Sequence, residues 1–554
     1  MTPFRSIPIA SIVLFSASLH AHALPGGVKD ALAGERIGLL DAGGLRLTNG
    51  KCRDCASSRQ SLWYFEDDLI AAPASAAVAA GVNAQLDRND DVRQWAATAP
   101  ARELVYPSVT WIGSPQIIDS AAIDSAGAAV TPAGGQAIAL ALTPKLSTNR
   151  SYADASTIRY FNQRPLRMRG AMTEKNGKPT FVARTIWPTD YAIDAVRLPL
   201  KPLAGIADLR GFVRDDSLGR DGTLSSRLVW ERSPGAGRQL AGKPVLGFML
   251  NGAQGDDDEA MGGHFAIATG RFGAKGEWAD WAVNNFYNLD SVSEKGIVAA
   301  TLPMDNYLMD LNSGQQYYRP SYMLVAILNK DRTAVAYQGG VQRTMNHFYR
   351  HDLTYAHAAN NCAGISMDVF RALGWNVPTR GATGHIKALG AYAYVAAKEA
   401  SLKKGRSIYD YLTEETTRLY PGIAFEAAGA DLLELVGAMA AKPRVRTPYE
   451  QQLAEDVDAI ILVKIPQIPS SRVAGSSPAF SFDEYMARVP ADHAKWKVVP
   501  VAPRPFPAAL RESGTALPAA TSVVPLPVAA IGAAGLFGGG ALWRRRKKKA
   551  TAKT

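Results

Sequence analysis

Residues 360–378 carry the most complete set of local folding signals in this chain of 554 residues. Asn360 or Asn361 is a natural N-cap residue, and Gly374 is a typical C-terminal stop. One apolar face recurs at helical spacing between them, and it consists of Cys362, Ile365, Val369 and Leu373. The sequence therefore predicts a helix that begins at Cys362 and ends before Gly374.

Cys362 would lie in the first turn of that helix. Unpaired backbone N–H groups and the helix dipole favour a thiolate there, so the position suits a nucleophile. The alternative is a small buried apolar side chain, which describes most cysteines outside disulfides.

His264 is the histidine with the most informative context, because it lies in segment 262–269, which is expected to form a strand. Ala266 and Ala268 share its face of the expected strand, and such small neighbours leave room for a helix end to approach. A thiol nucleophile needs a base of this kind. The alternative is a hairpin in which His264 only packs.

The next expected strand covers residues 280–286. Burial of Trp281 and Val283 on the side of Phe265 predicts a register with Asn284 on the face of His264. Asn284 is therefore the candidate residue for orienting the imidazole.

Other polar clusters are weaker candidates. His347 and His351 have the i, i+4 spacing of zinc ligands, but no Glu follows His347, so the H-E-x-x-H pattern is absent. Together with His357 they are expected in loops near Cys362. The acidic run 256–259 suits a solvated loop, with a calcium site or a binding lip as alternatives. We expect no metal and no cofactor.

The two ends of the chain indicate export. Residues 1–23 combine Arg5, an apolar stretch and a final Ala-His-Ala, as in a signal peptide. Residues 524–554 contain Val-Pro-Leu-Pro, the apolar run 528–543 and a basic cluster, which predicts a single membrane segment with its basic tail in the cytoplasm.

This tail resembles the PEP-CTERM class of bacterial sorting signals in its VPLP variant. The resemblance implies an exosortase-type transpeptidase as a partner, with Pro525 and Pro527 carrying the recognition. It also implies a location on the periplasmic face of the inner membrane, with release to the cell surface or extracellular matrix after cleavage. A plain membrane anchor is the alternative.

The net charge of +11 belongs mainly to these ends, which contribute eight of the positive charges and leave about +3 for the body. We therefore exclude nucleic acid as a partner. Cys52 and Cys55, the only cysteines besides Cys362, are expected to form a disulfide in an oxidising compartment. A redox-active pair is the alternative.

The predicted fold class is α+β. We expect a β-rich region over 24–240, with a loop or insert around 119–136, and a domain of strands followed by the Cys362 helix over 241–380. A mainly helical extension with one strand follows over 381–470, and a Pro/Ser/Ala-rich linker over 471–523 leads to the sorting signal.

The order of a strand histidine, a second strand with a polar residue and a downstream Asn-Cys that opens a helix resembles the circularly permuted papain-like superfamily over about 244–380. The resemblance implies a thiol hydrolase or acyltransferase acting on an amide, peptide or ester bond. Cys362 would attack, His264 would act as base and acid, and Asn284 would orient the imidazole. The substrate would be an envelope peptide, glycopeptide or lipid. The alternative is a non-catalytic surface or matrix protein that uses this domain for binding or structure.

Overall fold

The structure is a computed structural model, which describes residues 37–41, 46–48, 60–64, 70–73, 83, 85–98, 101, 109–112, 116–143, 155–215, 223–254, 261–286, 299–311, 314–317, 319–349, 353, 358, 360–382, 384–440, 443–469 and 474–488.

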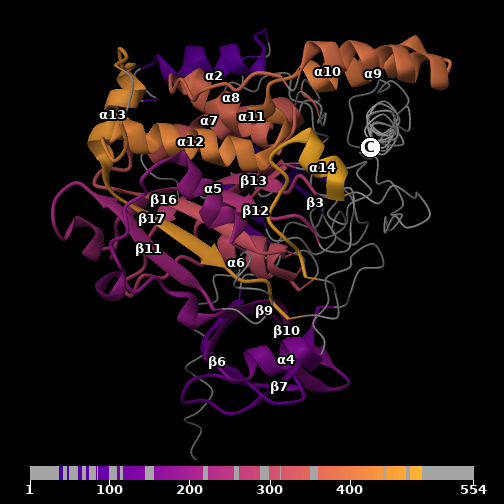
Figure 1. Cartoon of the computed structure of the whole chain (residues 1–554). Coiled ribbons are helices and arrows are strands. Elements are labelled where there is room, and N and C mark those ends of the chain that lie inside the picture. The colour runs from indigo at the N-terminus through magenta and orange to yellow at the C-terminus, as the bar shows by residue number, and fades with distance from the viewer. Residues whose placement is uncertain are drawn as a thin grey trace, which may run out of the picture.

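Five strands close into a barrel in the order β10-β8-β7-β6-β9, seen at the bottom of Figure 1. They are β6 (Gln116–Ile123), β7 (Ala129–Thr131), β8 (Ile138–Leu142), β9 (Leu166–Lys175) and β10 (Lys178–Pro188). The β9–β10 hairpin turns at Asn176 and Gly177, with φ of 52° and 72°, as a two-residue Asn-Gly turn requires. Parallel pairing of β8 with β10 completes the closure. The stretch 119–136, expected as a loop or insert, instead includes strand residues of β6 and β7.

Two smaller sheets come before the barrel strands in sequence. One contains β1 (Ile37–Asp41), β2 (Arg46–Thr48) and β3 (Gln60–Tyr64), and the other pairs β4 (Ile70–Pro73) with β5 (Val109–Ile112). Helix α2 (Arg88–Ala96) lies between β4 and β5 in sequence. It packs against α7 (Arg332–Tyr349) and α8 (Cys362–Leu373), which cover the largest sheet.

The largest sheet has seven strands in the order β11-β17-β16-β12-β13-β14-β15, and every neighbouring pair is antiparallel. Its strands are β11 (Ser225–Glu231), β12 (Pro244–Asn251), β13 (His264–Arg271), β14 (Ala282–Phe286), β15 (Ala299–Pro303), β16 (Ser321–Leu328) and β17 (Val457–Ile465). Strand β11 comes from the predicted β-rich region, and β17 comes from the predicted helical extension. Both nevertheless join the strands of the central region in one sheet.

Helices α7 (Arg332–Tyr349), α8 (Cys362–Leu373) and α12 (Pro421–Leu435) cover one face of this sheet (Figure 1). Thr269 of β13 donates to Gln338 of α7 over 2.8 Å, and the ring of Phe248 lies 5.8 Å from that of Phe370 in α8. We call the side that carries Phe248 and Thr269 the helix face.

The opposite side, which we call the barrel face, carries Asn251 of β12 and is covered by α6 (Met304–Met309). The hydroxyl of Tyr307 in α6 donates to Asn251 Oδ1. Helix α6 also packs against β10, so it lies between the sheet and the barrel. Three indoles continue this contact, with ring centroids 4.7 Å apart for Trp187 and Trp278 and 5.9 Å for Trp278 and Trp281.

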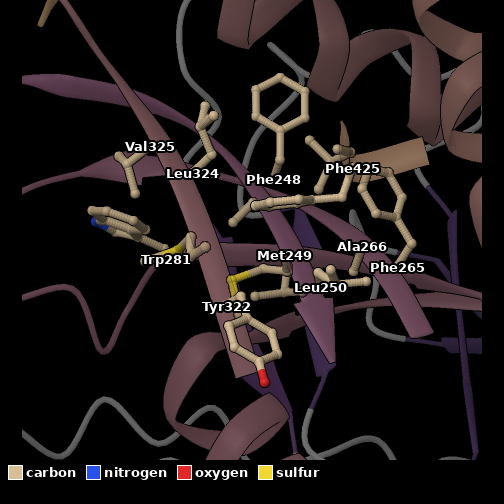
Figure 2. Packing of buried hydrophobic residues seen from close by; sticks show 14 of the residues in the cluster. Phe248, Met249, Leu250, Phe265, Ala266, Trp281, Tyr322, Leu324, Val325 and Phe425 are labelled. Carbon is tan, nitrogen blue, oxygen red and sulfur yellow. The ribbon is translucent and has the colours of Figure 1, made fainter. Parts of the chain in front are cut away.

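The core is buried on both faces of the central strands. Every residue of β12 and β16 is buried. Figure 2 shows Phe248 and Phe265 with Phe425 of α12 packed beside them. A strand buried on both sides has no polar face to mark its register.

The remaining helices lie around this core. They are α4 (Ala155–Phe161), α5 (Ile206–Arg214), α9 (His385–Lys398), α10 (Leu402–Thr413), α11 (Thr416–Leu419), α13 (Pro448–Asp456) and α14 (Phe482–Arg488). Helices α9 and α10 form a hairpin that extends away from the sheet at the upper right of Figure 1.

The predicted fold class needs correction. The described residues form an α+β fold in which a closed barrel and a seven-stranded sheet replace the simpler β-rich region and papain-like sheet. Among these residues, no helix combines the length and the apolar character needed to cross a membrane. Residues 528–543, on which the expected membrane segment falls, lie outside the described part of the chain.

Candidate functional site

Cys362 is the first residue of α8, as predicted, and Asn361 is its N-cap. The Asn361 side-chain oxygen accepts from the backbone N–H of Gly364 over 2.8 Å. The helix ends at Gly374, which has φ of 104°. The Cys362 residue is 5% exposed, so its thiol lies at a helix N-terminus but below the surface.

Replacing Asn361 with Ala is expected to destabilise the protein by about 1 kcal/mol, because the first turn of α8 loses its side-chain cap. The same change removes the bond from Asn361 Nδ2 to the Arg418 carbonyl oxygen, 2.7 Å long. Denaturant unfolding measures the loss. Asn361→Asp keeps the capping oxygen and should recover part of it. A loss as large for Asp as for Ala would show that the cap is unimportant.

His264 is the first residue of β13 and is 3% exposed. Its Nε2 donates to Asn285 Oδ1 over 2.7 Å. Because an amide oxygen only accepts, this bond places the ring proton on Nε2 and makes Nδ1 the basic nitrogen of the neutral ring. The imidazole is therefore held in one tautomer by an asparagine, as a Cys–His–Asn arrangement requires.

The asparagine bonded to His264 is Asn285, whereas the sequence analysis selected Asn284. In the observed register Asn284 lies opposite Ile267, so it shares the helix face with Ile267 and Thr269. The predicted register is wrong by one residue. Its premise was that only one side of the hairpin is apolar, but all residues of β14 are buried, so burial of Val283 does not choose a face.

Asn284 belongs to a separate polar cluster on the helix face. Its Nδ2 donates to Gln338 Oε1 over 3.0 Å, and its Oδ1 accepts from Thr301 over 2.8 Å. Thr269 donates to the same Gln338 oxygen. These contacts fasten α7 to β13, β14 and β15, which is a structural role.

His264 points to the barrel face. It pairs with Asn251 across β12 and β13, and its ring centroid is 6.3 Å from that of Tyr307 in α6. Helix α8 packs against β13 and β14 from the helix face. The structure therefore does not place the imidazole on the sheet face that α8 covers.

A series of contacts links the start of α8 to the start of β13. Asn361 is bonded to Arg418 of α11, which directly precedes α12. At the start of α12, a Cβ on Gly422 would lie 2.9 Å from the ring of Phe480. Phe480 belongs to residues 474–488, which we call the C-terminal strap.

The strap in turn contacts the residues just before His264. The backbone N–H of Ala479 donates to the Met261 carbonyl over 2.8 Å, and a Cβ on Gly263 would lie 2.8 Å from Pro478. This series of contacts connects the start of α8, through the start of α12 and the strap, with the start of β13.

Sequence reasoning missed the polar residues beneath His264. Asn251 Nδ2 donates to Ser321 Oγ over 2.7 Å, and Ser321 donates to Gln316 Oε1 over 2.5 Å. Gln316, in a short 3-10 helix (Gln315–Tyr317), donates to the Ile465 carbonyl over 3.0 Å. The sequence signal is limited to Asn251 as a polar residue at the end of an apolar strand, since its partners are distant in the chain.

The other predicted residues are dispersed. His347 Nε2 lies 3.0 Å from Asp91 Oδ2, a buried pair between α7 and α2. Among the described residues, no group of three or more His, Cys, Asp or Glu side chains could hold a metal ion. The structure does not describe the other predicted positions: Cys52, Cys55, the acidic run 256–259, His351, His357, Pro525 and Pro527.

Comparison with protein-family models, with curated proteins and with solved structures finds no match to this chain.

Proposed function

We propose that this chain is an exported thiol hydrolase or acyltransferase that acts on an amide, peptide or ester bond. The observation that carries the proposal is His264, a buried imidazole held by Asn285 over 2.7 Å with Nδ1 as its basic nitrogen. Support comes from Cys362, which opens the capped helix α8, and this helix packs against β13. The signal peptide, the Cys52–Cys55 disulfide and the exosortase-type partner stay predictions.

In this mechanism Nδ1 of His264 takes the thiol proton and the Cys362 thiolate attacks the carbonyl carbon. Backbone N–H groups in the first turn of α8 stabilise the oxyanion. The tetrahedral intermediate then collapses, and the imidazolium returns the proton to the departing amine or alcohol. Water or an acceptor nucleophile releases the acyl group from sulfur. Asn285 takes the orienting role that the sequence analysis gave to Asn284.

A second candidate is a non-catalytic exported protein of the surface or matrix. It is favoured by one observation, that the His264 ring lies on the barrel face whereas α8 covers the helix face. In that case His264 and Asn285 would only link β13 to β14.

Iodoacetamide labelling of Cys362 against pH, followed on its own peptide by mass spectrometry, separates the two. For an enzyme we expect a labelling midpoint well below about 8.5, the ordinary value for a cysteine thiol. His264→Ala should abolish that shift, and Asn285→Ala should reduce it because the imidazole loses its orientation.

Asn284→Ala is the matched control, because it removes the neighbouring carboxamide on the other face of the same strand. It should leave the labelling midpoint unchanged. An ordinary midpoint that His264→Ala does not alter would overturn the enzyme proposal and favour the binding or structural protein.

A further inference from the structure

Three arginines surround one buried aspartate where α8 packs against α2 and α11 (Figure 1). Asp368 of α8 is 6% exposed. Arg88 of α2 donates to its Oδ2, and Arg418 of α11 donates to both carboxylate oxygens, over 2.8 and 2.9 Å. Arg371, one turn further along α8, reaches Asp368 Oδ1 at 3.4 Å and Glu415 Oε1 at 2.8 Å. One carboxylate is thus shared by three guanidinium groups.

Two of these guanidinium groups keep buried nitrogen atoms that meet no acceptor among the described residues. They are Nε and Nη2 of Arg371 and Nη1 of Arg88. A buried donor without an acceptor costs free energy, and the cost is larger when the donor is charged. The planar fork of an arginine matches two oxygens of a carboxylate or a phosphate. Arg371 therefore presents a two-donor edge for which the described part of the chain provides no acceptor.

The carboxylates compensate the three arginines unequally. Burial opposes ionisation of Arg418, but Asp368 together with Glu415 and Glu414 raises its pKa above the ordinary value. Burial lowers the pKa of Arg88, and the charge of Arg418 adds to this effect while Asp368 opposes it. Negative charge is therefore concentrated at Arg418, and positive charge is in excess beside Arg88.

This arginine cluster lies close to the protein surface. The side chains of Arg371 and Arg88 are 22% and 11% exposed. A small anion therefore needs only side-chain movement to reach them. Both guanidinium groups contact the carboxylate of Asp368, so they lie close enough together for one small anion to bridge them.

We propose that the arginine cluster binds a phosphate group that bridges Arg371 and Arg88. Two phosphate oxygens accept from Nε and Nη2 of Arg371, and a third accepts from Nη1 of Arg88. A tetrahedral group suits donors on two separate side chains, whereas a planar carboxylate is already filled by the edge of Arg371. The phosphate also supplies the negative charge that Arg88 lacks. The proposal is independent of the thiol chemistry, because none of these residues takes part in that reaction.

The test is equilibrium dialysis of the full chain against radiolabelled inorganic phosphate at constant ionic strength, with chloride as the balancing anion. We expect saturable binding of one phosphate per chain. Arg371→Lys keeps the charge but removes the two-donor edge, so it should weaken binding about tenfold or more. Arg88→Gln should weaken binding as well. Arg406→Gln is the matched control, because Arg406 belongs to an exposed ion pair with Asp410 on α10, and it should leave binding unchanged.

Denaturant unfolding with and without phosphate provides a second readout. Phosphate should stabilise the wild type and Arg406→Gln, because it binds only the folded chain, and it should stabilise Arg371→Lys much less. This comparison also shows that each variant folds.

Absence of saturable phosphate binding to the wild type would overturn the proposal. Binding that survives both Arg371→Lys and Arg88→Gln would overturn it as well, because the anion would then bind elsewhere. Acetate bound as tightly as phosphate would assign the edge of Arg371 to a carboxylate and would overturn the bridge to Arg88. Glycerol phosphate as a competitor distinguishes the sources of the group. Displacement of bound phosphate would support a phosphate carried by a larger molecule, and lack of displacement would support the free ion.

Discussion

Replacing Gly263 with Ala is expected to destabilise the protein by about 3 kcal/mol and to disturb the start of β13, because two independent penalties meet at this residue. Its φ is 78°, a left-handed backbone conformation that is strained for a residue with a side chain. A Cβ there would also lie 2.4 Å from the Asn251 carbonyl oxygen and 2.8 Å from Pro478. Backbone atoms of a central strand cannot move away cheaply. We expect His264, the next residue, to shift with the strand end.

Gly262→Ala is the control, because a Cβ at this neighbouring glycine would meet nothing within 4 Å. It should leave the free energy of unfolding nearly unchanged. Denaturant unfolding of both variants, with the Cys362 labelling midpoint as a second readout, tests the prediction. Equal stability of the two variants would show that the strap and the Asn251 strand do not constrain the chain at Gly263.

Local signals in the sequence were sufficient for the helix that carries the candidate nucleophile. The start at Cys362, the Asn361 cap and the Gly374 stop are all observed. Each depends on residues within one turn of the helix end, where capping chemistry acts. The existence of the strand that begins at His264 was equally accessible, because Gly263 and the alternation after it are local features.

Register and sheet sidedness were not accessible in the same way. Choosing between Asn284 and Asn285 requires knowing what covers each face of β14, and here both faces are buried. The cover on the barrel face is α6, which follows β15 and is itself packed on the barrel. No periodicity near His264 reports that arrangement, so the sequence could not show that α8 would lie on the other side.

Closure of the barrel could not be predicted from local sequence patterns either. The β9–β10 hairpin is readable from Asn176-Gly177, but the parallel pairing of β8 with β10 joins segments about forty residues apart and has no sequence marker. Strands such as β7, only three residues long, are also too short to show alternation.

The second large effect is expected where the barrel meets the sheet. Asp305 of α6 and Arg169 of β9 are each 0% exposed, and Arg169 Nε lies 2.9 Å from Asp305 Oδ2. Arg167 approaches the same oxygen at 3.4 Å. Asp305→Ala should therefore destabilise the protein by about 3–5 kcal/mol, because a buried guanidinium loses its main counter-charge.

Two control variants separate this cause from loss of packing. Asp280→Ala removes a second carboxylate that contacts Arg169, but this carboxylate is 60% exposed, so we expect a loss of about 1 kcal/mol or less. Asp305→Leu combined with Arg169→Met removes both buried charges and should cost clearly less than Asp305→Ala alone. A double variant as unstable as the single one would assign the effect to packing.

The pH dependence gives an independent check on the same carboxyl group. Burial raises the pKa of Asp305 above its ordinary value of 3.8, against the opposing effect of Arg169 and Arg167. A carboxyl whose folded pKa exceeds the unfolded value contributes stability that is fully present below the unfolded pKa. That contribution is lost as the pH rises through the folded pKa. Asp305→Asn removes this titration, so the stability difference between wild type and variant should change in favour of the variant as the pH rises from 3.8. A difference that stays constant with pH, or moves the other way, would show that the two arginines outweigh burial and hold the carboxylate in its charged form.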